Sequence, residues 1–365
     1  MPTRRETPKR SDKKIERTDA AKHRATARTE KRQTHARQTS VAIVGAGRLG
    51  SALALALSQS GYQLAALVAR RGRHARLIAR TLSPRPLVLD ATRLDLLPDT
   101  VDLILITTPD DQLTEVAARL AEASAAHRVE QTTAQHAPST SRRKQQSHRR
   151  TSRVALHASG ALTSDALAPL RDEGFSLGSL HPLVSISEPR AGARSLTGGA
   201  FYCLEGDAPA LAAARRIVRA LGGRSFSINA RDKSLYHAAA VITSGHTVAL
   251  FSLASDLLSL CGLTDRRARQ VLLPLLASTL DNLRAHAPGE ALTGTFARAD
   301  LRTVRKHLAA LGEAADTDRD ALAVYALLGA RSLRLAARRH SNFDPAVAKE
   351  IATLLRRVLE RPTKR

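Results

Sequence analysis

A short apolar run that leads into three glycines constrains the fold of this chain more than any other feature. Residues 41–50 read Val-Ala-Ile-Val-Gly-Ala-Gly-Arg-Leu-Gly, and an Ala- and Leu-rich stretch then predicts a helix from Ser51 to about Ser58. In such a strand–turn–helix unit the glycines allow the tight turn, the approach of a pyrophosphate and close helix packing, and the helix N-terminus offers amide donors. The alternative is a glycine-rich turn in a fold that has lost its nucleotide. The predicted dinucleotide-binding residues of this turn are Gly45, Gly47, Arg48, Leu49 and Gly50.

The residues after the second apolar run indicate which dinucleotide would bind. The run from Leu64 to Val68 leads into Arg70 and Arg71. An NAD site places an Asp or Glu near this position, against the ribose 2′-hydroxyl. A guanidinium instead pairs with a 2′-phosphate, and each charge-assisted hydrogen bond is worth about 1.5–3 kcal/mol. The arginines therefore favour NADP(H) over NAD(H), unless they are solvated surface residues of an arginine-rich chain.

Length and composition limit the class of protein. With 365 residues and 43% hydrophobic content, the chain can form two globular domains. We find no apolar run long enough to cross a membrane and no leader peptide, and we expect no membrane association. Cys203 and Cys261 lack C-x-x-C spacing, and the histidines lack the spacing of metal ligands. These features predict reduced thiols, no metal site and a cytoplasmic location.

The net charge of +24 is concentrated in two segments. Residues 1–39 contain 13 Lys or Arg and 5 Asp or Glu, and residues 127–153 contain 7 Lys or Arg and 1 Glu. Both lack apolar periodicity, which predicts a disordered basic tail and a disordered basic insertion. Neither contains interleaved aromatic residues, so we expect a solvated tail and, at most, non-specific contact with nucleic acid.

The order of apolar segments predicts the architecture. Strands expected at 41–44, 64–68, 86–89, 101–107, 154–157, 201–204 and 225–228 alternate with helices at 51–58, 73–81, from about 111 to 125, 165–173 and 208–221. From Asp232 onward only helices are expected, at 232–261, 265–285, 300–310, 318–339 and 344–361. The predicted fold class is α/β: a doubly wound Rossmann domain at 40–229, carrying the insertion, followed by an all-helical domain at 230–361.

Six short motifs in this order resemble a known family. They are Gly45-Ala-Gly-Arg-Leu-Gly, Thr108-Pro-Asp-Asp, His157-Ala-Ser-Gly-Ala-Leu, Ser179-Leu-His-Pro-Leu, Leu235-Tyr-His-Ala-Ala-Ala and Ala291-Leu-Thr-Gly. From about residue 40 to 340, outside the insertion, the chain resembles Rossmann-like proteins with a DUF2520 C-terminal domain. These are similar to pyrroline-5-carboxylate, ketopantoate and 3-hydroxyisobutyrate-type NAD(P) reductases. The resemblance implies a homodimer that pairs through its helical domain.

This chain departs from the family pattern at three positions. Gly245 stands where the family tends to have Asn, and Thr295 and Ala299 replace a Pro and a Gly before Asp300. The missing Asn removes an amide that could bind substrate, while Arg298 and Asp300 are retained. These departures favour a second interpretation, a non-catalytic NADP(H)-binding or sensor protein. A third interpretation is a nucleic-acid-associated protein that acts through its basic tail.

The candidate chemistry is hydride transfer, which requires positioning and a proton donor. Lys233 and His237 lie four residues apart and share one helix face; the resemblance suggests Lys233 as a catalytic group, and a histidine donates a proton near neutral pH. His181 precedes a proline, which favours extended backbone. All three also fit structural roles. Thr107, Thr108 and Pro109 are expected at the cofactor, and His157, Ser159, Arg298 and Asp300 at the substrate, although Asp300 also fits an N-cap.

The leading prediction is an NADP(H)-dependent oxidoreductase that acts on a small, anionic carbonyl or imine compound.

Overall fold

A computed structural model describes residues 39–135, 153–314, 319–338 and 344–360. The predicted basic tail, apart from its last residue, and residues 136–152 of the predicted insertion lie outside the described residues. The described chain divides into two compact units between Val241 and Ile242. The composition of the sequence predicts a domain boundary near residue 229, directly after the last strand. The first compact unit instead ends at Val241 and so includes most of one further helix.

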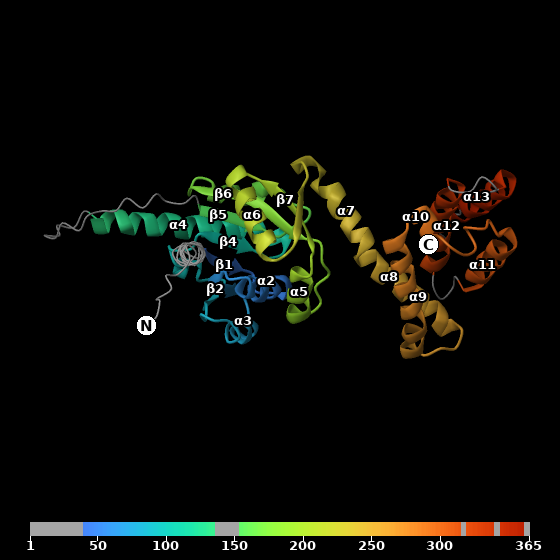
Figure 1. Cartoon of the computed structure of the whole chain (residues 1–365), viewed down its shortest axis with the longest axis horizontal. Coiled ribbons are helices and arrows are strands. Elements are labelled where there is room, and N and C mark those ends of the chain that lie inside the picture. Colours follow the sequence, from blue (N-terminus) through green and yellow to red (C-terminus); the bar gives the residue numbers. More distant parts are fainter. Residues whose placement is uncertain (1–38, 136–152, 315–318, 339–343, 361–365) are drawn as a thin grey trace, which may run out of the picture. The chain divides into compact units, whose positions relative to one another are not determined.

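The first unit contains one eight-stranded sheet in the order β3-β2-β1-β4-β5-β6-β7-β8. Figure 1 shows this sheet together with its helices. All neighbouring pairs are parallel except β6 and β7. The chain order reverses at β1, which has β2 on one side and β4 on the other, so the crevice of a doubly wound fold lies between β1 and β4. The strands are β1 (Ser40–Val44), β2 (Gln63–Ala69), β3 (Leu87–Asp90), β4 (Leu103–Ile106), β5 (Arg153–His157), β6 (Phe175–Pro182), β7 (Phe201–Gly206) and β8 (Arg224–Ser227).

Helices cover both faces of the sheet. Alternate residues of β1 enter different cores: Val41 and Ile43 contact one helical layer, and Ala42 and Val44 contact the other. The first layer contains α2 (Arg48–Gln59), α3 (Gly72–Ala79), α5 (Pro189–Thr197) and α6 (Ala208–Ala220). The second contains α4 (Leu113–Gln135) and the 3₁₀ segments η1 (Leu94–Leu96) and η3 (Ser164–Leu170). The continuous apolar runs of the central strands result from this burial on both faces.

Several local predictions were wrong. The helix expected at 165–173 is the 3₁₀ segment η3, which contains Pro169. Helix α5 had no counterpart in the prediction, and α4 continues to Gln135, so the first residues of the predicted disordered insertion are helical. Asp110 and Asp111 belong to the 3₁₀ segment η2 (Asp110–Gln112), so α4 begins at Leu113, after the start expected near residue 111.

The second unit is helical, as predicted for the C-terminal region. After η4 (Ala230–Asp232) and α7 (Lys233–Thr243), which begin in the first unit, the helices are α8 (Gly245–Leu260), α9 (Asp265–Ala285), α10 (Pro288–Ala291), α11 (Leu301–Glu313), α12 (Arg319–Ala337) and α13 (Pro345–Leu359). The core of this unit consists of Val304, Ala326, Leu333, Ile351 and Leu355, from α11, α12 and α13.

The long segment Ala230–Leu260 corrects one prediction. It is apolar and long enough to cross a membrane by length and composition, and only 6% of its most apolar window is buried. The single helix expected at 232–261 is divided at Ser244 into α7 and α8. One such segment is weak evidence for a membrane span, because a helix face that packs against another protein has the same composition.

Candidate functional site

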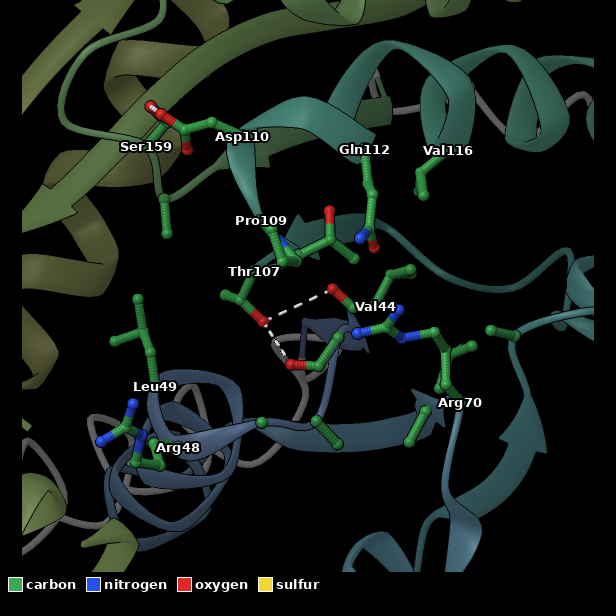
Figure 2. Close-up of a pocket in the computed structure, with 18 of the residues that line it drawn as sticks. Val44, Arg48, Leu49, Arg70, Thr107, Pro109, Asp110, Gln112, Val116 and Ser159 are labelled. Atoms are coloured by element: carbon green, nitrogen blue, oxygen red, sulfur yellow. Dashed lines mark hydrogen bonds between the residues drawn. The ribbon is translucent and has the colours of Figure 1, made fainter. Parts of the chain in front are cut away.

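A cleft of about 1500 Å³ opens at the carboxyl ends of the central strands of the first unit (Figure 2). The glycine turn after β1, the residues after β2 and β4, and the loop after β5 all line it. This is the crevice where doubly wound sheets bind ligands. Among the predicted cofactor residues, those that line the cleft are Gly45, Gly47, Arg48, Leu49, Arg70, Arg71, Thr107, Thr108 and Pro109.

The glycine turn has the shape that the sequence predicts. Gly45 has φ +106°, and a Cβ on it would lie 2.8 Å from the backbone carbon of Thr107. A Cβ on Gly50 would lie 2.3 Å from the carbonyl oxygen of Gly45, which explains why α2 passes so close to the turn. The Thr107 hydroxyl donates to the Gly45 carbonyl at 2.7 Å, as Figure 2 shows. Thr107 was predicted to contact the cofactor, and in the structure its hydroxyl stabilises the glycine turn.

Two features of the turn suit an anion or another polar ligand. Gly47 is the N-cap of α2; it provides no side-chain cap, and the first helical turn has no acidic residue. The N-terminus of α2 therefore keeps its partial positive charge toward the cleft. The Thr108 hydroxyl oxygen is buried without a hydrogen-bond partner among the described residues. A buried polar atom of this kind costs free energy unless a ligand or water satisfies it.

One end of the cleft is basic. Arg70 and Arg71 follow β2, and Figure 2 shows the Arg70 guanidinium pointing into the pocket. His74 of α3 and Arg119 of α4 also line the cleft, and Arg119 donates a hydrogen bond to the Ala91 carbonyl at 2.8 Å. His74 and Arg119 could not be identified from the sequence, because they lie on the later helices α3 and α4 and only the fold brings them to the cleft.

His181 and His237 also line the cleft and form a T-shaped pair, with ring centroids 5.7 Å apart. Gly160 makes this pair possible, since a Cβ on it would lie 2.3 Å from His237 Nδ1 and 2.9 Å from His181 Nε2. The Nδ1 atom of His237 is buried and has no hydrogen-bond partner in the described part of the chain. Burial, and then the nearby His237 and Lys233, lower the pKa of His181 to about 4, so His181 is neutral at pH 7.

Lys233 lies in a different environment from the one expected of a cleft residue. It is 1% exposed, does not line the cleft, and donates to the Ser179 hydroxyl at 2.8 Å and to the Ser159 carbonyl at 3.2 Å. Burial lowers its pKa, while Glu205 acts in the opposite direction. Glu205 in turn accepts hydrogen bonds from the backbone and hydroxyl of Ser164. In this arrangement Lys233 supports the loop that carries Ser159 and Gly160.

The loop after β5 contains two predicted substrate residues. His157 is fully buried; its Nε2 lies 2.9 Å from the Thr163 carbonyl, and its Nδ1 accepts from the Ser159 amide at 3.2 Å. Burial and Lys233 lower the pKa of His157 to about 4. Ser159 lines the cleft and donates to Asp110 at 2.8 Å. Of the two, only Ser159 reaches the cleft, while His157 holds the backbone of the loop.

Arg298 and Asp300 belong to the second unit. Asp300 is the N-cap of α11 and accepts hydrogen bonds from the Thr303 amide at 3.0 Å and the Thr303 hydroxyl at 2.7 Å. Ala299, which stands where the family tends to have Gly, has φ +50°. A role for Arg298 and Asp300 at a substrate stays a prediction.

The sequence matches two domain families. Residues 24–141 match the Rossmann-like domain, and residues 200–332 match the domain of unknown function DUF2520. The protein combines a Rossmann-like domain with a DUF2520 domain. This confirms the resemblance that the six motifs carry, while no curated protein matches the chain in sequence.

Two solved structures share the fold of this chain. The chain is 19% identical to the candidate NADP oxidoreductase BF3122 from Bacteroides fragilis, with a TM-score of 0.58 over 89% of this chain and 99% of that one. It is 21% identical to protein TM1727 from Thermotoga maritima, with a TM-score of 0.57 over 82% of this chain and all (100%) of that one. At these identities the likeness establishes the fold of the Rossmann-like DUF2520 protein.

Proposed function

We propose that this Rossmann-like DUF2520 protein is an NADP(H)-dependent oxidoreductase that acts on a small, anionic carbonyl or imine compound. The observation that carries the proposal is a single cleft of the first unit lined by the glycine turn, the Arg70–Arg71 pair and the His181–His237 pair. The glycine turn and the two arginines are features that bind a dinucleotide phosphate, and the two histidines are polar groups of the kind that a reaction at the nicotinamide needs. BF3122, which shares the fold, is described as a candidate NADP oxidoreductase.

The residues of the cleft fit NADP(H). The glycine turn and the N-terminus of α2 would hold the pyrophosphate, and Arg70 and Arg71 would pair with the 2′-phosphate. The unpaired Thr108 hydroxyl offers a further polar contact near the turn. When bound, the cofactor supplies or accepts the hydride.

The histidine pair would act on the substrate. His181 and His237 both lie beside Gly160 and line the cleft, where both can hydrogen-bond to a carbonyl oxygen or an imine nitrogen. Lys233 acts indirectly, by holding the Ser159 carbonyl and Ser179. The anionic character of the substrate rests on Arg298 in the sequence motif.

Titration of the full chain with NADPH and NADH, followed by nicotinamide fluorescence, tests the cofactor. The Arg70→Ala/Arg71→Ala variant should weaken NADPH binding about tenfold or more and leave NADH binding nearly unchanged, because each lost bond is to a charged phosphate. The matched control is Arg73→Ala/Arg80→Ala, which removes the same charge from exposed residues outside the cleft lining. If neither nucleotide binds saturably, the oxidoreductase proposal fails.

Turnover tests the reaction. We expect NADPH oxidation with at least one member of a panel of small 2-oxo acids and cyclic imines, and a large loss of kcat in His237→Ala. Tight NADPH binding without turnover of any member would instead support a non-catalytic NADP(H)-binding protein.

We also propose that the protein is a homodimer. Helices α8 and α9 of the second unit expose large apolar side chains, among them Val248 and Leu275, which are 69% and 63% exposed. A second copy of the chain would cover this apolar surface, and exposed patches of this kind usually mark such interfaces.

A further inference from the structure

Three side chains from three elements meet beside the cleft. His181 of β6 and Cys203 of β7 are directly opposite each other in the antiparallel strand pair, so their side chains lie on the same face of the sheet. Tyr236 of α7 reaches both: its hydroxyl lies 2.6 Å from His181 Nδ1 and hydrogen-bonds with the Cys203 thiol. Phe226 packs edge-on against the Tyr236 ring at 6.0 Å and restricts its position.

The direction of the Tyr236–His181 hydrogen bond follows from the acidity of the two groups. Burial raises the pKa of Tyr236, so its hydroxyl keeps its proton, and burial together with His237 and Lys233 lowers the pKa of His181. Between a neutral phenol and a neutral imidazole, the phenol is the stronger donor and the ring nitrogen the stronger acceptor. The thiol of Cys203 is a weak donor and acceptor and competes poorly for the same hydroxyl.

A donor at Nδ1 leaves the imidazole proton on Nε2. The Nε2 edge of His181 lies beside Gly160, which itself lines the cleft. We propose, building on the function proposed above, that Tyr236 is a positioning residue that holds His181 as a neutral imidazole whose Nε2–H donates a hydrogen bond to the carbonyl oxygen or imine nitrogen of the substrate.

This assignment separates the roles of the two histidines. A neutral His181 polarises the C=O or C=N bond and keeps its own proton, since its loss would leave an imidazolate anion. NADPH, when bound, would supply the hydride to the substrate carbon, and the proton that the oxygen or nitrogen must then gain would come from His237 or from water. The charged and titratable groups around His181 are His237 and Lys233 on α7, Asp110 on η2 and His157 on β5.

The test is a long-range ¹H–¹⁵N correlation spectrum of the histidine side chains in the full chain, without cofactor or substrate. His181 is assigned by the signals that disappear in His181→Gln. We expect a pyridine-type, hydrogen-bonded Nδ1 and a pyrrole-type Nε2, with no change in protonation between pH 5.5 and 8. In Tyr236→Phe, the Nδ1 resonance should move toward the position of a pyridine-type nitrogen without a hydrogen bond. A proton on Nδ1, or an imidazolium at pH 7, would overturn the proposal.

The second unit contains a matched control. The Tyr325 hydroxyl lies 2.8 Å from His307 Nδ1, and the two rings are T-shaped with centroids 5.7 Å apart, much as in the Tyr236–His181 pair. Tyr325→Phe should therefore change the His307 signals and leave those of His181 unchanged. If Tyr236→Phe also leaves them unchanged, Tyr236 does not position His181.

Kinetic measurements distinguish the role of Tyr236 from the proposed function of the protein. With an active substrate, Tyr236→Phe should lower kcat about tenfold or more and leave the Kd of NADPH unchanged, because His181 contacts substrate rather than the phosphates. An unchanged kcat would contradict the positioning role. If the parent binds no NADPH, the proposed function fails, while the spectra still decide whether Tyr236 donates to His181.

Discussion

The two units of this protein bury their apolar side chains to different extents. In the first unit the sheet is covered on both faces, and apolar residues of its strands and helices form two large cores. In the second unit the core cluster comes from α11, α12 and α13, while α8 and α9 carry exposed residues such as Val248 and Leu275. The first unit therefore closes its own core, whereas the second leaves large apolar side chains of α8 and α9 exposed, the surface that we propose a second copy covers.

The largest expected effect is on association through this surface. Val248→Glu/Leu275→Glu should convert the proposed homodimer to monomer by light scattering, since an unpaired charge in an apolar interface weakens association roughly a hundredfold or more. The control is Leu96→Glu in the first unit, where Leu96 is 46% exposed. If the parent protein is monomeric and binds lipid vesicles, the partner of α7 and α8 is a membrane, and the homodimer proposal is wrong.

A clash in the glycine turn should destabilise only the first unit. Gly50→Ala places a Cβ 2.3 Å from the Gly45 carbonyl, and we expect a loss of about 2–4 kcal/mol in unfolding free energy together with loss of NADPH binding. Gly61→Ala is the control. Gly61 has φ +87°, but a Cβ on it would meet no described atom within 4 Å, so we expect only backbone strain of about 1 kcal/mol. Urea unfolding monitored by circular dichroism measures both. Equal losses would show that the turn has room for the methyl group.

Acid should also act on the first unit. The pKa of buried His157 is about 4 when folded, below the ordinary value of 6.5, so the unfolded chain binds more protons between these values. The stabilisation is complete above pH 6.5 and is lost as the pH falls toward 4. Between pH 7 and 4.5 we expect a loss on the order of 2 kcal/mol from this residue. Urea unfolding at the two pH values should show a smaller loss in His157→Gln, and an equal loss would contradict the assignment.

The smallest effect separates the two roles of Asp300 in the second unit. If Asp300 is an N-cap, Asp300→Ala should cost about 1 kcal/mol, as should Asp344→Ala, whose side chain caps α13 in the same way. Asp300→Asn keeps the cap and removes the charge. A loss of turnover in Asp300→Asn without loss of stability would support the predicted role at the substrate, and unchanged turnover would leave Asp300 as a cap.

Much of the fold could be predicted because its signals are local. The apolar runs at 41–44 and 101–107 identify strands buried on both faces, and the glycine spacing identifies the turn between β1 and α2. The 3₁₀ segment η3 and the short helix α5 were mispredicted because tertiary packing, rather than apolar periodicity, shapes them. The continuous apolar run at 232–261 concealed the break at Ser244 for the same reason.

The candidate site was less predictable. The types of residue were recognisable, but the sequence could not show that the Thr107 hydroxyl braces the turn or that Lys233 is enclosed by Ser159 and Ser179. Tyr236 belongs to one of the six motifs, but the sequence predicted no role for it, because its partners His181 and Cys203 are distant in the chain. Each of these features depends on side chains that meet only after the sheet has formed.

The doubly wound class, the glycine turn and the basic residues after β2 follow from the amino-acid sequence, because they depend on residues close together in the chain. Which polar groups reach the cleft depends on tertiary packing. Burial and hydrogen-bond partners set the direction of each side chain, and here the residues involved come from β5, β6, α7 and the loop after β5, which are distant in the chain. His181 and His237 therefore meet beside Gly160 at the cleft, while His157 and Lys233 are buried and do not line it.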